Sequence, residues 1–251
     1  MTDAIADRIR FVLVRTSHPG NIGAAARAIR TMGLNRLSLV APHAFPHAEA
    51  IALASGANDV LENATISADL PAAIADCQLV LGATARRRDV PMEEIGPREA
   101  ATRALAAARG GREVALVFGN ERTGLENDEV KRCHAAVLIP SDPAFPSLNL
   151  AQAVQVLAYE VRMAVLAGAS PLPEQKSDLP ASSAELDAFF EHLERTLDAI
   201  DFHKGRSPRT IMLRLRRLYL RAQPDQRELR VLHGILSDSE RIARLARAKY
   251  E

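Results

Sequence analysis

The stretch from Val114 to Tyr159 limits the possible folds of this 251-residue chain more than any other part of the sequence. Two short apolar runs, Val114 to Phe118 and Ala136 to Ile139, have the length and β-branched content of buried strands. Each run leads directly into a loop rich in Gly, Asn, Pro and Ser. Because ligands bind beyond the carboxyl ends of buried parallel strands, we expect a site between these loops.

A helix follows the second loop and should complete this site. Asn149 can cap the helix, with Gln152 at the capping-box spacing of three residues. An apolar stripe continues along it, formed by Leu150, Ala153, Val154, Leu157, Ala158, Val161 and Val165. The N-terminus of the helix would therefore point unpaired amides at whatever lies between the loops.

Strands and helices alternate along residues 9–166. Strands are expected at 9–14, 37–40, 64–66, 78–83, 114–118 and 136–139, and helices at 24–32, 49–54, 69–75, 98–109 and from Leu150 onward. This alternation predicts an α/β fold, in which a parallel sheet is covered by helices on both faces.

Composition excludes several classes of protein. The content of 47% apolar and 25% charged residues is ordinary for a globular chain. Cys77 and Cys133 follow no metal-site spacing and are too few for a disulfide scaffold. The first eight residues contain two aspartates and no long apolar core, so we expect no signal peptide, no membrane span and, by default, a cytoplasmic protein.

A second unit should follow residues 171–180, which contain three prolines, several charges and no periodicity. Ser182 with Glu185 forms a further capping box, and an apolar helical stripe comes after it. Ser207-Pro208 and Pro224-Asp225 each mark the start of another helix. We therefore expect a first domain at 1–168, a linker at 169–181 and a small all-α domain at 182–251.

Positive charge is concentrated in this second unit. Residues 202–221 include seven basic side chains and no acidic one, whereas residues 1–170 have 17 basic and 18 acidic side chains. The seven are Lys204, Arg206, Arg209, Arg214, Arg216, Arg217 and Arg221. Such a cluster favours contacts with phosphates, and a solvated basic face is the alternative interpretation.

Three other candidate sites are weaker. His43 and His47 lie four residues apart, but a proline between them argues against a regular helix and no third ligand is near, so we expect no metal. Arg86-Arg87-Arg88 follows a strand and either meets phosphate or faces solvent. Adjacent strand residues point to opposite faces, so Cys133 and His134 favour a structural role over a nucleophile pair.

Three motifs, in this order, are similar to those of a known family. They are His18 to Ala28 (HPGNIGAAARA), Phe118 to Leu125 (FGNERTGL), and Ile139-Pro140 with Ser147 to Leu150 (SLNL). Together they resemble the motifs of the SpoU branch of the SPOUT RNA 2′-O-ribose methyltransferases, over about the first 165 residues. The linker and helical tail resemble those of bacterial members that methylate cytidine or uridine in the tRNA anticodon loop.

The resemblance implies a trefoil knot at the carboxyl end of the sheet, S-adenosylmethionine bound in that knot without a metal, and a homodimer with the site between subunits. The implied reaction is 2′-O-methylation of a tRNA ribose at position 32. The alternatives are methylation of rRNA or another tRNA site, and an inactive RNA-binding protein of the same fold.

The resemblance also assigns residues. Arg27 matches the catalytic arginine, and because a guanidinium is essentially always protonated we expect it to hold a phosphate and the nucleophile rather than act as a base. Asn21 would orient Arg27, Glu121 would organise the knot loop, and Asn149 would cap its helix and touch cofactor or substrate. The expected cofactor contacts are Ala83, Thr84, Ala85, Gly119, Gly124, Ile139, Ser147 and Leu148. The expected RNA contacts are Arg86 and the seven basic residues of 202–221.

Overall fold

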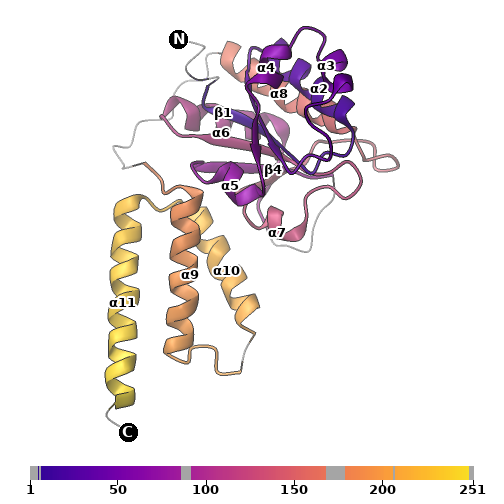
Figure 1. Ribbon diagram of the computed structural model, residues 1–251. Coiled ribbons are helices and arrows are strands. Elements are labelled where there is room, and N and C mark those ends of the chain that lie inside the picture. The colour runs from indigo at the N-terminus through magenta and orange to yellow at the C-terminus, as the bar shows by residue number, and fades with distance from the viewer. Residues whose placement is uncertain (1–4, 6, 86–91, 168–178, 206, 249–251) are drawn as a thin grey trace. The chain divides into compact units, whose positions relative to one another are not determined.

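A computed structural model describes residues 5, 7–85, 92–167, 179–205 and 207–248 (Figure 1). The chain divides into two compact units, Met1–Glu174 and Gln175–Glu251, and each is described by itself. Within the described ranges, no helix is both long and apolar enough to cross a membrane.

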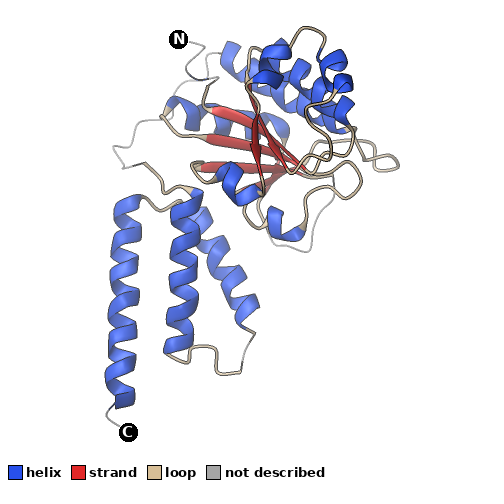
Figure 2. Ribbon diagram, viewed as in Figure 1, coloured by secondary structure: helices blue, strands red, loops and turns tan. Residues whose placement is uncertain are grey.

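The described part of the first unit contains one parallel sheet with the strand order β3-β2-β1-β6-β4-β7-β5 (Figure 2). The strands are β1 (Ile9–Val14), β2 (Arg36–Val40), β3 (Thr65–Ser67), β4 (Leu79–Ala83), β5 (Glu94–Ile95), β6 (Val114–Phe118) and β7 (Ala135–Val137). The central strands β1 and β6 are buried along their whole length. Burial on both faces explains why these strands are continuous apolar runs without alternation.

Helices cover both faces of the sheet, which confirms the expected α/β fold class (Figure 2). One face packs against α2 (Pro19–Thr31), α3 (Ala48–Ala54), α4 (Asn58–Glu62), α6 (Pro97–Arg109) and α8 (Leu150–Leu166). The other packs against α5 (Leu70–Ile74) and α7 (Asn127–Val130). Two separate hydrophobic cores therefore hold the sheet, one on each face.

The structure changes some of the predicted boundaries. Helix α2 starts at Pro19 instead of Ala24, because proline is well suited to a first helical position, where no N–H is needed. Strand β7 ends at Val137, two residues before Ile139, because its pairing with β4 ends with that strand at Ala83. The sequence analysis missed α4, α7 and β5, which are too short to show a periodicity.

The second unit is all-α over its described residues, as expected. It contains α9 (Ser183–Ala199), α10 (Pro208–Ala222) and α11 (Gln226–Ala248). The predicted capping box is present, since the Ser182 hydroxyl accepts from the Glu185 amide and the Glu185 carboxylate accepts from the Ser182 amide. The three helices share a core in which Phe189 meets Tyr219 edge-on at a centroid distance of 4.7 Å.

Helix α2 approaches α3 so closely that Gly23 has no room for a side chain. A Cβ atom at Gly23 would lie 2.0 Å from the backbone oxygen of Ala50. This contact is between backbones, which do not rotate away as a side chain would. Gly23 therefore fixes the position of α2, whose N-terminus faces the polar loops.

We expect Gly23→Ala to lower the free energy of unfolding by about 2 kcal/mol, because the added methyl group forces the two helices apart. Gly110→Ala is the control, since Gly110 has a φ of −77° and its nearest neighbours lie at an ordinary 3.5 Å. Urea unfolding of both variants measures the effect. Equal losses of stability in the two variants would contradict the packing explanation.

Candidate active site

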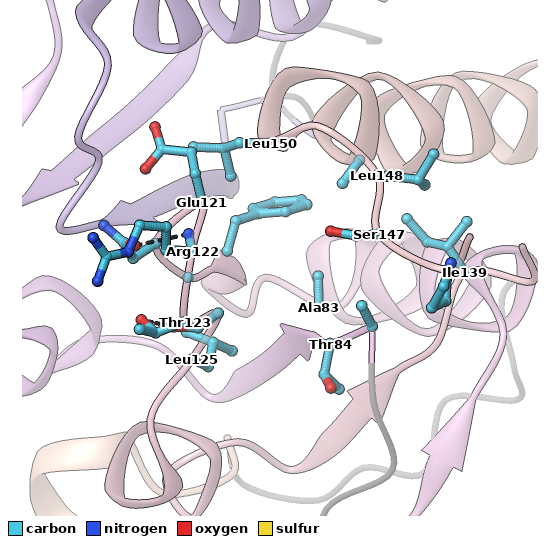
Figure 3. A pocket seen from close by; sticks show the side chains of 17 residues that line it. Ala83, Thr84, Glu121, Arg122, Thr123, Leu125, Ile139, Ser147, Leu148 and Leu150 are labelled. Carbon is cyan, nitrogen blue, oxygen red and sulfur yellow. Dashed lines mark hydrogen bonds between the residues drawn. The ribbon is translucent and has the colours of Figure 1, made fainter. Parts of the chain in front are cut away.

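Loops at the carboxyl ends of β4, β6 and β7 surround a cavity of about 270 Å³ (Figure 3). The structure brings together at this cavity all eight residues that the sequence analysis assigned to a cofactor. They are Ala83 at the end of β4 with Thr84 and Ala85 after it, Gly119 and Gly124 after β6, and Ile139, Ser147 and Leu148 after β7. The N-terminal part of α8 adds Leu150 and Ala153 to the lining.

The lining combines small and apolar side chains with the polar side chains of residues 120–123. Phe118, Leu125 and Leu150 supply apolar surface, while the residues after β4 have side chains too short to fill the space. A cavity of this kind suits an organic ligand that is held by van der Waals contact and by hydrogen bonds to the backbone.

Residues 119–125, here called the pocket loop, fold back tightly on themselves. A Cβ atom at Gly119 would lie 2.1 Å from the backbone carbon of Gly124, and Gly124 itself has a φ of +67°. The Gly124 amide donates to the Asn120 carbonyl over 2.8 Å. Both glycines are therefore required, one by close approach and the other by its left-handed backbone.

A chain of hydrogen bonds joins the three sequence motifs. Glu121 accepts from the amides of Ser17 (2.9 Å) and His18 (3.2 Å), directly before α2, and from the side-chain amide of Asn21 (2.9 Å). The Asn149 side-chain amide in turn donates to the Asn21 oxygen over 2.9 Å. Glu121 thus binds amides at the start of α2, which has no side-chain cap of its own, and this fits the expectation that Glu121 organises its loop.

These bonds also decide the ionisation of Glu121. Burial alone would favour the neutral carboxyl group. The donated hydrogen bonds from Asn21 and from backbone N–H groups outweigh burial, so the pKa of Glu121 lies below its ordinary value. Glu121 is therefore an ionised, fully occupied acceptor at neutral pH.

Asn149 has the capping role that the sequence predicts. Its side-chain oxygen accepts from the amides of Ala151 (2.9 Å) and Gln152 (3.4 Å) at the start of α8. The Gln152 side chain completes the capping box by accepting from the Asn149 amide over 3.3 Å. One end of Asn149 thus caps α8, and the other reaches Asn21.

Arg27 lies apart from these groups. It is exposed, does not line the cavity of its own chain, and donates to the Ser55 hydroxyl over 3.4 Å. Asn21 is bonded to Glu121 and Asn149 instead of orienting Arg27. The reason is helical geometry, because residues three or four apart face each other on a helix and residues six apart do not.

The basic residues of the second unit differ in their surroundings. Lys204, Arg209, Arg214, Arg217 and Arg221 are exposed. Arg216 instead pairs with Asp187 and lies over the ring of Phe190 at 4.6 Å. Arg86 and Arg206, two further predicted RNA contacts, lie outside the described residues.

Two of the weaker candidate sites contain residues with local structural roles, and Arg86-Arg87-Arg88 lies outside the described residues. The His47 ring accepts from the Glu49 amide over 3.2 Å and so caps α3. Burial raises the pKa of the Cys133 thiol to about 12, which leaves it unsuited to act as a nucleophile. In the described part of the chain, no three His, Cys, Asp or Glu residues are grouped as metal ligands.

The sequence analysis did not find the contacts of Asn120. Its side-chain amide donates to the carbonyl of Arg15 (2.6 Å) and to the hydroxyl of Ser17 (2.8 Å), both directly after β1. The only signal for these contacts was that a polar loop follows both β1 and β6, which are neighbours in the sheet. Without knowing that β1 pairs with β6, nothing in the sequence joins these loops.

Comparisons with known proteins cover both units of the chain. Residues 8–159 match the SpoU rRNA Methylase family, and residues 184–248 match the family described as tRNA methyltransferase TrmJ, C-terminal domain. The chain is 50% identical over 246 residues to a tRNA (cytidine/uridine/adenosine-2′-O-)-methyltransferase TrmJ of Pseudomonas aeruginosa, covering 95% of this chain and 96% of that protein. A tRNA (cytidine/uridine-2′-O-)-methyltransferase TrmJ of Klebsiella pneumoniae is 48% identical, with 92% and 96% covered. The crystal structure of TrmJ from Z. mobilis has a TM-score of 0.79 and 36% identity, with 92% and 98% covered.

The lowered pKa of Glu121 predicts a pH-dependent contribution to stability. Because the folded-state pKa is depressed, the contribution is present above the unfolded-state pKa of about 4.3 and is lost as the pH falls through the folded-state value. We expect Glu121→Gln to be less stable than the unmodified chain at pH 7, and the difference to shrink on acidification. Urea midpoints at several pH values test this. A difference that stays constant down to the acid range would show that the charge is not responsible.

Proposed function

Because this chain belongs to the SpoU family of RNA methylases, we propose that it transfers a methyl group from S-adenosylmethionine to the ribose 2′-hydroxyl of cytidine or uridine in tRNA. One observation carries this proposal: the second and third family motifs line one cavity, and hydrogen bonds of Asn21 to Glu121 and Asn149 join the first motif to both of them. The tRNA-modifying relatives also match the helical unit, which favours tRNA over rRNA as substrate.

The residues that line the cavity fit S-adenosylmethionine. The volume of about 270 Å³ lies near the lower end of the ~300–1,000 Å³ that small-molecule sites occupy. Ile139, Leu148 and Leu150 would pack against the apolar parts of the cofactor, and backbone groups at Thr84 and Gly119 would hold its polar parts. When bound, the cofactor supplies an electrophilic methyl group on a positively charged sulfur.

The chain's own task is to position the 2′-hydroxyl for in-line attack on that methyl group. Glu121 keeps its three donors and its charge, so we assign it to holding the loops and not to proton transfer. Arg27 is exposed, which suits a contact of its guanidinium group with an RNA phosphate beside the reacting ribose.

A homodimer would bring Arg27 to a cavity. Arg27 does not line the cavity of its own chain, so we propose that it serves the cavity of a second copy. Helix α8 offers a surface for the second copy, since the side chains of Tyr159, Met163 and Leu166 are exposed on it. We also propose that the chain forms a trefoil knot at the carboxyl end of the sheet and that this knot holds the pocket loop.

The exposed basic residues of the second unit, Lys204, Arg209, Arg214, Arg217 and Arg221, are proposed as phosphate contacts. Arg216 is less suited to that role, because Asp187 and Phe190 already occupy its guanidinium group. We further propose position 32 of the anticodon loop as the target and the cytoplasm as the location, where tRNA is modified.

Methyl transfer from radiolabelled S-adenosylmethionine to total tRNA and to rRNA tests the proposed function. We expect incorporation of the label into tRNA, and mapping of the 2′-O-methylated ribose should identify position 32. Incorporation into rRNA alone would support the alternative substrate. Cofactor binding without transfer to either RNA would support an inactive RNA-binding protein.

We expect Arg27→Ala to abolish methyl transfer while S-adenosylmethionine binding, measured by calorimetry, stays near normal. A second variant, Ala85→Trp, should fill the cavity and abolish binding. If Arg27 acts on the partner's cavity, co-expression of the two inactive variants should restore about a quarter of normal activity, because half of the dimers are mixed and each has one complete site. Purified mixed dimers without activity would contradict this arrangement.

Phosphate contacts by α10 predict a change in the salt dependence of tRNA binding. Replacing Arg209, Arg214 and Arg217 by Gln should reduce the slope of log affinity against log salt by about 2 to 3 units. The matched control replaces Arg230, Arg241 and Arg244, three exposed arginines of α11, and should leave the slope nearly unchanged. Equal slopes for both variants would mean that α10 contributes no specific phosphate contacts.

A further inference from the structure

Arg15 contacts Asn120 near the start of the pocket loop and Glu126 directly after its end. At the start of the loop, the Arg15 carbonyl accepts from the side chain of Asn120 over 2.6 Å. Directly after the loop, the Arg15 guanidinium pairs with Glu126 over 3.1 Å. The same guanidinium also binds both carboxylate oxygens of Glu129 in α7. A single residue after β1 therefore contacts both the pocket loop and the chain segment that follows it.

The backbone of Arg15 is itself fixed to the sheet. Its amide donates to the Val40 carbonyl at the end of β2 over 2.8 Å, so the residue is tied to the edge where the cavity lies. Its φ is +51°, a left-handed conformation that residues other than glycine seldom adopt. Residues are held in such conformations where the surrounding structure requires them.

The ion pair with Glu129 is protected from solvent more than a surface pair would be. The Glu129 side chain is 11% exposed and that of Arg15 is 34% exposed, so salt and water screen the pair only partly. Glu129 also accepts from the Glu126 amide over 2.6 Å and thereby closes the capping box of α7. Arg15 therefore acts through Glu129 on the backbone amide of Glu126, the residue directly after the pocket loop.

We propose that Arg15 is a positioning residue for the cofactor site, which it supports by clamping the pocket loop in its binding conformation. Arg15 does not line the cavity and acts on the pocket loop, which does, through its contacts with Asn120 and Glu126. A loop that is already ordered loses less conformational entropy when a ligand binds. The inference rests on the proposed function, because it assumes that the ligand of this cavity is S-adenosylmethionine.

The test uses the variant Arg15→Met, which removes the charge and keeps most of the aliphatic part of the side chain. We expect the dissociation constant of S-adenosylmethionine, measured by calorimetry, to rise about fivefold. The KM for S-adenosylmethionine should rise with it, while kcat at saturating cofactor stays within about twofold, because reacting groups are untouched. Arg15→Lys retains the charge but cannot make the bidentate contact with Glu129, so it should give an intermediate affinity for S-adenosylmethionine.

Arg103→Met is the matched control. Arg103 in α6 also pairs with two carboxylates, Glu93 and Glu99, and its side chain is 35% exposed, but it does not line the cavity. This variant should lose some thermal stability and bind the cofactor normally. If Arg103→Met weakens binding as much as Arg15→Met, the effect is general destabilisation and the proposal is overturned.

A double variant tests the path through α7. Glu129→Gln keeps an oxygen that can accept from the Glu126 amide but loses the charge that Arg15 binds. If Arg15 acts through its pair with Glu129, the double variant should bind S-adenosylmethionine no more weakly than Arg15→Met alone. Additive losses, or an Arg15→Met variant that binds normally, would overturn the proposal. Failure of the unmodified chain to bind S-adenosylmethionine would instead refute the proposed function.

Discussion

The carboxylate of Glu121 is the group on which the site depends most. It accepts hydrogen bonds from Ser17, His18 and Asn21, about a hundred residues earlier in the chain. It stays charged despite partial burial because these donors outweigh the cost of desolvation. The start of α2 and the pocket loop are therefore tied together electrostatically, and Asn149 extends the connection to α8 through Asn21.

Around this connection, the site is built from loops that follow neighbouring strands of the sheet. Parallel strands end at one edge of a sheet, and the loops after β4, β6 and β7 meet there. Small residues at 83–85 keep the cavity open, since larger side chains would occupy it. Gly119 instead lets the pocket loop fold back on itself, because a Cβ atom there would lie 2.1 Å from the backbone of Gly124. Contacts that hold the loops, such as that of Arg15 with Glu129, therefore bear on the shape of the cavity.

The helical unit shows that charge along a sequence and charge on a surface are different quantities. In the sequence alone, nothing distinguishes the seven basic residues within 202–221 as candidate phosphate contacts. In the folded unit, Arg216 turns to Asp187 and Phe190, where it stabilises the packing of α9 against α10. Its exposed neighbours Arg214 and Arg217 remain available to a polyanion. Which cations meet solvent depends on the helical face that each occupies.

The amino-acid sequence by itself determined the fold class, the strands β1 and β6 and the cap of α8 by Asn149, and its resemblance to a known family identified eight of the residues that line the cavity. These features depend on local patterns: apolar runs, capping residues and loop motifs that a single segment carries. Only the tertiary structure decided that Asn21 binds Glu121 and Asn149 instead of Arg27, and that Arg15 holds the pocket loop. Those contacts join residues about a hundred positions apart, and their partners are set by strand order and helical phase, which no local pattern encodes.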